Sequence, residues 1–298
     1  MAVRMSSPSS RPSLASDAPI GIFDSGIGGL TVAHAMAQAM PAERMLYFGD
    51  TAHMPYGDRS PELVRTYSVR IAEFLAAEGC KAIVIACNSA SATAKEAVEA
   101  SVGPGIPVID VVAPVVKYLS EQGAERVGVM GTRATVGSGI YGRSLREAHA
   151  GVGRTGCRVE EWPTPLLAPL IEEGWQSHAI MLPVIEGYLQ SAGWVKGQDR
   201  LIDALVLGCT HYPLAADAFR EVLGDAVEIV DGPSIVASAV ASALLDKGLT
   251  APTSQSEGGG LAAHRFMVSD LTENFVRSAQ RFFGTEVPLV PGGPWFQH

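Results

Sequence analysis

The sequence lacks the features that would place the chain in a membrane, on a nucleic acid or in a disulfide framework. No apolar run reaches the roughly 18 residues that a membrane span requires. The net charge of −9 argues against a broad basic surface for nucleic acid or anionic lipid. The chain has four cysteines and no C-x-x-C pair, so we expect reduced thiols and a cytoplasmic location.

Residues 1–18 also lack a feature, the apolar stretch of a secretory signal. They are rich in Ser and Pro, so we expect a disordered tail. The total length of 298 residues suggests that about two domains follow this tail.

Two stretches containing cysteine share one pattern. In residues 82–94 a short apolar run ends at Cys87, and a stretch typical of a helix follows. Residues 204–214 repeat this plan around Cys209. A single cysteine in this setting is often only a buried core residue. Two in the same setting favour a shared chemical role, and a helix N-terminus would lower the pKa of a nearby thiol.

Small polar turns precede both cysteine stretches at similar separations. Ser25 follows a predicted strand at 20–23, and Thr132 follows another at 126–130. We infer an α/β fold of two pseudo-symmetric domains with mainly parallel sheets, each offering one thiol to a cleft between them. The predicted domains are residues 19–112 plus 231–298, and residues 113–230. The second part of the first domain includes a strand at 265–268 and a closing helix at 271–283, which should rejoin it.

Two glycine-rich segments call for opposite interpretations. The turn at 24–29 lies between a predicted strand and a helix, where free backbone N–H groups can bind an anion. Asp24 at its start is either a helix cap or a functional carboxylate. Residues 137–142 match G-x-G-x-x-G, but they come several residues after the strand ends, so we do not assign dinucleotide binding to them. Residues 161–174 are interpreted as a Pro-rich connection carrying acidic residues to an exposed edge.

Four chemistries could use the cysteines. Cys87, Cys209 and His211 could bind zinc, but the spacing is unlike a structural zinc site. A disulfide would bring the two Cα atoms within about 7 Å and leave no room for a substrate. A Cys209–His211 nucleophile would leave Cys87 unexplained. Proton exchange uses both thiols: one removes a proton from a substrate carbon and the other delivers one to the opposite face.

The proton-exchange interpretation needs no cofactor. A pyridoxal phosphate racemase needs a Schiff-base lysine, and no lysine of this chain lies at the end of a predicted strand. Asp24 and His211 could each assist one thiol, and hydroxyls with helix-start amides could hold carboxylates.

At these residues the sequence resembles the glutamate racemase family. The matching segments run in family order across nearly the whole chain. They are residues 19–32, Gly-Asp-Thr at 49–51, Pro-Tyr-Gly at 55–57, Ala-Cys-Asn-Ser-Ala at 86–90, Gly-Thr at 131–132 and Leu-Gly-Cys-Thr-His-Tyr-Pro at 207–213.

The resemblance implies a role for each matching residue. Cys87 would act on D-glutamate with help from Asp24, and Cys209 on L-glutamate with help from His211 and Glu172. The implied substrate contacts are Asp24, Ser25, Tyr56, Gly57, Asn88, Ser89, Thr132, Thr210 and His211. The chain departs from the family at Ser89, where Thr is usual, and at Trp162, where many members have Cys.

The resemblance also implies the biological setting. It implies that the protein supplies D-glutamate for peptidoglycan and forms a homodimer. Family members form homodimers in differing arrangements, so the resemblance does not specify which arrangement this chain adopts. Some members bind DNA gyrase, and no feature of this acidic sequence supports or excludes that partner. Three other functions stay open: another racemase of the superfamily, acting on aspartate or a hydantoin; a regulatory binding protein without activity; and a nucleotide-binding oxidoreductase using residues 137–142.

Overall fold

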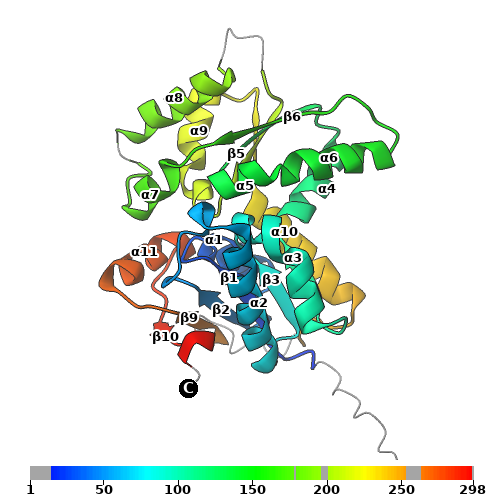
Figure 1. Ribbon diagram of the computed structural model, residues 1–298, viewed down its shortest axis with the longest axis vertical. Helices are drawn as coiled ribbons and strands as arrows, with labels where there is room; N and C mark the ends of the chain where they lie inside the picture. The colour runs from blue at the N-terminus through cyan, green and yellow to red at the C-terminus, as the bar shows by residue number, and fades with distance from the viewer. Residues whose placement is uncertain (1–14, 178, 196–200, 253–262, 297–298) are drawn as a thin grey trace, which may run out of the picture.

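Two parallel β-sheets organise the molecule, for which the computed structural model describes residues 15–177, 179–195, 201–252 and 263–296 (Figure 1). The six-stranded sheet contains β1 (Ile20–Asp24), β2 (Met45–Gly49), β3 (Ala82–Ile85), β4 (Val108–Asp110), β9 (Arg265–Val268) and β10 (Leu289–Pro291). The four-stranded sheet contains β5 (Arg126–Gly131), β6 (Arg158–Pro163), β7 (Ala204–Gly208) and β8 (Glu228–Val230). The α/β class with parallel sheets is therefore confirmed.

The two sheets share one strand order. The first is ordered β10-β9-β2-β1-β3-β4 and the second β6-β5-β7-β8, so in both the first strand lies between the second and third. This common order is what the repeated turn-and-cysteine pattern predicts. The last two strands add to the edge of the first sheet beside β2, which confirms that the end of the chain rejoins the first half.

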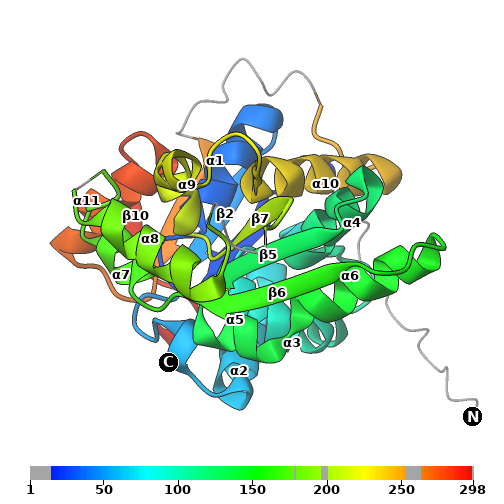
Figure 2. The ribbon, with the colours of Figure 1, turned by 90° about the horizontal axis from the view of Figure 1, so that it is seen from above.

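Helices cover both faces of each sheet (Figures 1 and 2). They are α1 (Leu30–Ala39), α2 (Pro61–Ala77), α3 (Asn88–Val102), α4 (Val112–Gln122), α5 (Arg133–Ser138), α6 (Ile140–Gly151), α7 (Leu167–Glu172), α8 (Met181–Ala192), α9 (Ala216–Leu223), α10 (Gly232–Asp246) and α11 (Glu273–Phe283).

Side chains alternate across β1 because successive residues of a strand point to opposite faces. Ile20 and Ile22 pack with α1, α10 and α11, whereas Phe23 packs with α2 and α3. Both sets are buried, which explains why the strand is apolar throughout. In the second sheet, one face packs on α4 and α6 and the other on α8 and α9.

Some sequence predictions differ from the structure or lie outside the described residues. Residues 158–163 form β6, which the Pro-rich interpretation missed because this edge strand is only half buried and carries two glutamates. The match at 137–142 spans α5 and α6 with no strand directly before it, so it lacks the strand–turn–helix context of a dinucleotide-binding turn. Residues 1–14 of the predicted tail lie outside the described residues.

None of the described helices is long and apolar enough to cross a membrane.

A buried ion pair joins the amino ends of the first three strands. Lys81 is fully buried, and its Nζ lies 2.5 Å from Oε2 of Glu43, which is 4 % exposed. The same nitrogen donates to the carbonyl of Ser16, and Oε1 of Glu43 accepts the N–H of Ala251 at 2.8 Å. The ion pair therefore also binds the segments at Ser16 and Ala251, which lie outside the strands.

Replacing Lys81 by Met should lower the free energy of unfolding by about 3–5 kcal/mol, because Glu43 would stay buried without its cation. Urea unfolding followed by circular dichroism measures the loss. The double variant K81M/E43Q should lose less, since Gln keeps the acceptor for Ala251 without a charge. Equal losses in both variants would contradict this account.

Candidate active site

Both predicted thiols open into one cavity between the sheets. Cys87 follows β3 and occupies the N-cap position of α3, and Cys209 follows β7. Each occupies the same position in its sheet, after the third strand, and each is 6 % exposed. The cavity has a volume of about 140 Å³. The repeated pattern in the sequence thus becomes two sulfurs facing one small space.

The structure brings nearly all of the predicted site residues to this cavity. Those that line it are Ser25, Tyr56, Gly57, Cys87, Asn88, Ser89, Thr132, Glu172, Cys209, Thr210 and His211. Asp24 is the exception, because its side chain is fully buried behind the lining. The roles of these residues stay predictions.

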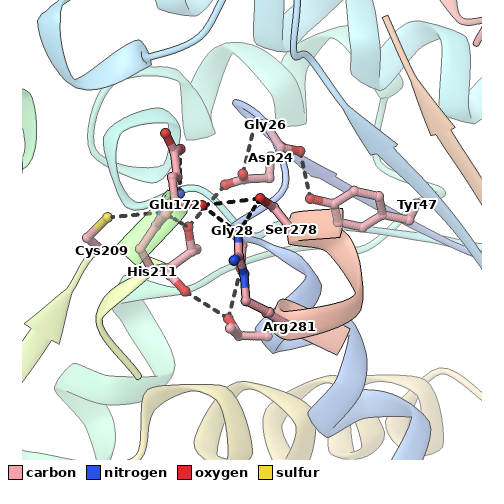
Figure 3. A network of polar contacts seen from close by, with 11 residues as sticks. Asp24, Gly26, Gly28, Tyr47, Glu172, Cys209, His211, Ser278 and Arg281 are labelled. Atoms are coloured by element: carbon pink, nitrogen blue, oxygen red, sulfur yellow. Dashed lines mark hydrogen bonds and ion pairs between the residues drawn. The ribbon is translucent and has the colours of Figure 1, made fainter. Parts of the chain in front are cut away.

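His211 connects Cys209 to Glu172 (Figure 3). Its Nδ1 lies 3.6 Å from Sγ of Cys209, and its Nε2 lies 2.7 Å from Oε1 of Glu172. Burial lowers the pKa of His211, but Cys209 and Glu172 outweigh burial and raise that pKa to about 10. The two neighbours thus hold the imidazole in its protonated, positively charged form beside the sulfur.

Cys87 has the opposite surroundings. Burial raises the pKa of its thiol to about 12, and the negative charge of Asp24 adds to the rise. The N–H of Ala90 at the start of α3 and the side chain of Ser25 lower it, but by less. The helix start therefore lowers this pKa as predicted, but burial outweighs the helix and the net shift of the Cys87 pKa is upward.

Asp24 is held by the turn that follows it. Its Oδ2 accepts the N–H of Gly26 at 2.9 Å, and the hydroxyl of Thr210 donates to Oδ1 at 3.5 Å. Burial raises the pKa of this carboxyl, and His211 and the backbone N–H groups oppose the rise. The carboxyl group of Asp24 and the thiol of Cys87, both with a raised pKa, thus lie on the same side of the cavity.

The glycine-rich turn allows the second half of the molecule to approach closely. A Cβ atom on Gly28 would lie 2.4 Å from Oγ1 of Thr210 and 2.5 Å from Nδ1 of His211. Thr31, in the first turn of α1, donates its hydroxyl to the carbonyls of Gly28 and Thr210, both at 3.0 Å. Gly28 therefore leaves space for the imidazole, a use that the anion-binding interpretation of this turn did not foresee.

Two further residues support the lining and were missed from the sequence. The hydroxyl of Tyr141 donates to Oδ1 of Asn88 at 2.7 Å, and the hydroxyl of Tyr56 donates to Oδ2 of Asp50 at 2.6 Å. Tyr141 belongs to the unassigned segment 137–142, so no signal pointed to it. Asp50 lies in the Gly-Asp-Thr segment, which carried the resemblance but no role.

Several hydroxyls also meet across the two halves. Oγ of Ser89 lies 2.9 Å from Oγ1 of Thr132, and the two side chains come from α3 and from the turn after β5. Their hydrogens can rotate toward a bound carboxylate. Among the described residues, no group of three or more His, Cys, Asp or Glu side chains is arranged to hold a metal ion.

Comparisons with known proteins agree on one family. The model of the Asp/Glu/Hydantoin racemase family matches residues 21–240. A glutamate racemase of Chlorobaculum tepidum is 40% identical over 280 residues, 93% of this chain and 96% of that protein. A crystal structure of glutamate racemase from Francisella tularensis in complex with D-glutamate has a TM-score of 0.83 and 33% identity, covering 94% of this chain and 98% of that chain.

A more distant structure shows the fold alone. Aspartate racemase of Picrophilus torridus is 16% identical with a TM-score of 0.52, covering 80% of this chain and 97% of that one.

Replacing Asp24 by Asn should lower the pKa of Cys87 below about 12, because the substitution removes a negative charge that opposes the thiolate. Alkylation of Cys87 by iodoacetamide at about pH 8 should then become faster, since the thiolate is the nucleophile. Peptide mass spectrometry measures the rate. Cys157, which lies away from the cavity, provides the control in the same sample. An unchanged or slower rate at Cys87 would contradict the assigned charge effect.

Proposed function

Because the chain belongs to the Asp/Glu/Hydantoin racemase family, we propose that it is a glutamate racemase that interconverts L- and D-glutamate without a cofactor. The observation that carries the proposal is the pair of thiols in one cavity, each at the same position of a related sheet. The product D-glutamate would serve peptidoglycan synthesis. This setting rests on the family and on the relatives named glutamate racemase.

The reaction moves one proton at each thiol. With L-glutamate, the thiolate of Cys209 takes the α-proton and becomes a thiol. The thiol of Cys87 then gives its proton to the opposite face of Cα and becomes a thiolate. The product is D-glutamate, and the reverse reaction exchanges the two roles. No other reactant is needed, because the proton lost by one sulfur replaces the one gained by the other.

The different surroundings of the sulfurs suit the start of the L-glutamate reaction. Burial and Asp24 keep the proton on Cys87, while Cys209 faces an imidazole whose pKa is raised to about 10. An acid and a base are thus prepared on two sides of the cavity before any proton moves. His211 and Glu172 are proposed to assist Cys209, and Asp24 to assist Cys87.

The remaining lining residues are proposed to hold the substrate. The hydroxyls of Ser25, Ser89 and Thr132 and the amide of Asn88 are suited to the two carboxylates. Backbone N–H groups at the starts of α3 and of the turn after β7 add donors without adding charge. Tyr56, Gly57 and Thr210 complete the proposed contacts.

Aspartate racemase is the alternative within the family. The cavity of about 140 Å³ is small, and its lining of hydroxyls together with Arg133 suits a dicarboxylate of either length. Turnover of glutamate and of aspartate, each supplied alone, decides between the two substrates.

The domain division, the location and the assembly are also proposals. Residues 19–112 with 231–298, and residues 113–230, would form the two domains, each built around one of the sheets. The four cysteines are free, as expected in the reducing cytoplasm. A homodimer would cover exposed apolar side chains such as Leu166 and Leu245.

Replacing either Cys87 or Cys209 by Ser should lower racemisation about 10²–10⁴-fold, because each variant lacks one proton-transfer group. Circular dichroism of glutamate measures turnover, and mass spectrometry in deuterated water measures deuterium at Cα. Cys157→Ser is the control and should keep full activity. Wild-type protein that neither racemises glutamate nor exchanges its α-proton would refute the proposal.

Light scattering after size exclusion should give twice the chain mass of 31.3 kDa. A mass equal to one chain, measured at micromolar concentration and unchanged on further concentration, would refute the homodimer.

A further inference from the structure

Helix α11 packs on the first sheet but also contacts side chains of the proposed active site that follow the second sheet. Phe283 packs edge-on against Phe266 of β9 and against His34 of α1, with ring centroids 5.2 and 5.5 Å apart. One residue earlier, Phe282 packs edge-on against the ring of His211 at 4.9 Å. The helix is therefore anchored on one half of the molecule and contacts the imidazole that lies beside Cys209.

Arg281 of the same helix holds the end of α7. Its Nη2 donates to the carbonyl of Glu172 at 2.6 Å, and Oγ of Ser278 donates to the same carbonyl at 3.2 Å (Figure 3). Nη2 also donates to Oγ of Ser278 at 2.7 Å. The last carbonyls of a helix have no partner within the helix, and a basic side chain satisfies them well.

Glu172 is held at both ends. Its carbonyl accepts hydrogen bonds from α11, and its carboxylate binds Nε2 of His211. A chain of contacts therefore runs from Arg281 through Glu172 and His211 to Sγ of Cys209. A shift of the α7 end would move the carboxylate that orients the imidazole.

The sequence leaves space for this arginine. Gly174 follows α7 with a φ of 82°, and a Cβ atom there would lie 2.2 Å from Nη1 of Arg281. In the described part of the chain, Nε of Arg281 is buried and has no hydrogen-bond partner. The guanidinium is therefore packed tightly against the turn that ends α7.

We propose that Arg281, with Ser278, is a positioning residue for the Glu172–His211–Cys209 relay, so that α11 of one half orients the acid–base group of the other. The proposal rests on the proposed racemase function. It assigns Arg281 to the Cys209 step, because Arg281 binds the carbonyl of Glu172, whose carboxylate binds the imidazole beside Cys209.

The kinetic test compares Arg281→Met and Arg281→Lys with Arg277→Met. Arg277 lies one turn earlier on the exposed face of α11 and is the matched control. Arg281→Met should lower kcat about tenfold with little change in KM, because the relay is misplaced and the substrate contacts are intact. Arg281→Lys should recover part of the loss, and Arg277→Met should behave as wild type.

Isotope effects assign the loss to one thiol. The two enantiomers are equal in free energy, so kcat/KM must fall equally in both directions. With 2-deuterated L-glutamate the isotope effect on kcat/KM should rise in Arg281→Met, because abstraction by Cys209 limits the rate. With 2-deuterated D-glutamate it should fall toward unity, because abstraction by Cys87 no longer limits. Equal changes in the isotope effects of the two enantiomers would overturn the proposal, as would an equal loss of kcat in Arg277→Met.

A second measurement needs no turnover. Iodoacetamide should alkylate Cys209 several-fold more slowly in Arg281→Met than in wild type, while the rate at Cys87 stays unchanged. Ser278→Ala should shift the rate at Cys209 in the same direction, and circular dichroism checks that each variant is folded. Unchanged labelling of Cys209 would overturn the positioning role. Selective slowing in a protein that racemises neither glutamate nor aspartate would support this role and refute only the proposed function.

Discussion

The contact between the Gly28 turn and the Thr210–His211 pair holds the carboxyl ends of the two sheets together. A residue with a side chain at position 28 would overlap the imidazole, and Thr31 bonds the carbonyls on both sides of the boundary. The cavity exists because the two sheet ends meet at this distance. Its small volume, the burial of both sulfurs and the raised pKa of Cys87 all follow from that approach.

A symmetric frame thus carries an asymmetric site. The strand orders of the two sheets agree, and each thiol follows the third strand of its set. The groups behind the sulfurs differ, however. Cys209 has an imidazole whose second nitrogen binds a carboxylate, and Cys87 has a buried carboxylate in its neighbourhood. Racemisation needs an acid on one face and a base on the other at any moment, so this inequality suits the proposed reaction.

The end of the chain adds a further asymmetry. Strands β9 and β10 and helix α11 extend only the first half, and α11 then reaches the end of α7 in the second. The surroundings of His211 therefore come from three separate parts of the chain. Glu172 lies 39 positions before His211 and Phe282 lies 282 − 211 = 71 positions after it, and neither belongs to the repeat that places the sulfurs.

The family resemblance supplied most of the cavity lining. The pattern of residues was enough to predict the parallel α/β class and the strand-end positions of Cys87 and Cys209. These are local properties, because apolar runs, turn residues and their repetition specify strand ends without knowledge of distant contacts. Strand β6 could not be predicted in this way, since an edge strand is half exposed and shows little apolar pattern. Three properties depend instead on the tertiary fold: the raised pKa of Cys87, the space that Gly28 leaves for His211, and the hydrogen bond from Arg281 to the carbonyl of Glu172. Burial and contacts between residues more than 60 positions apart set these properties, and no local pattern records either.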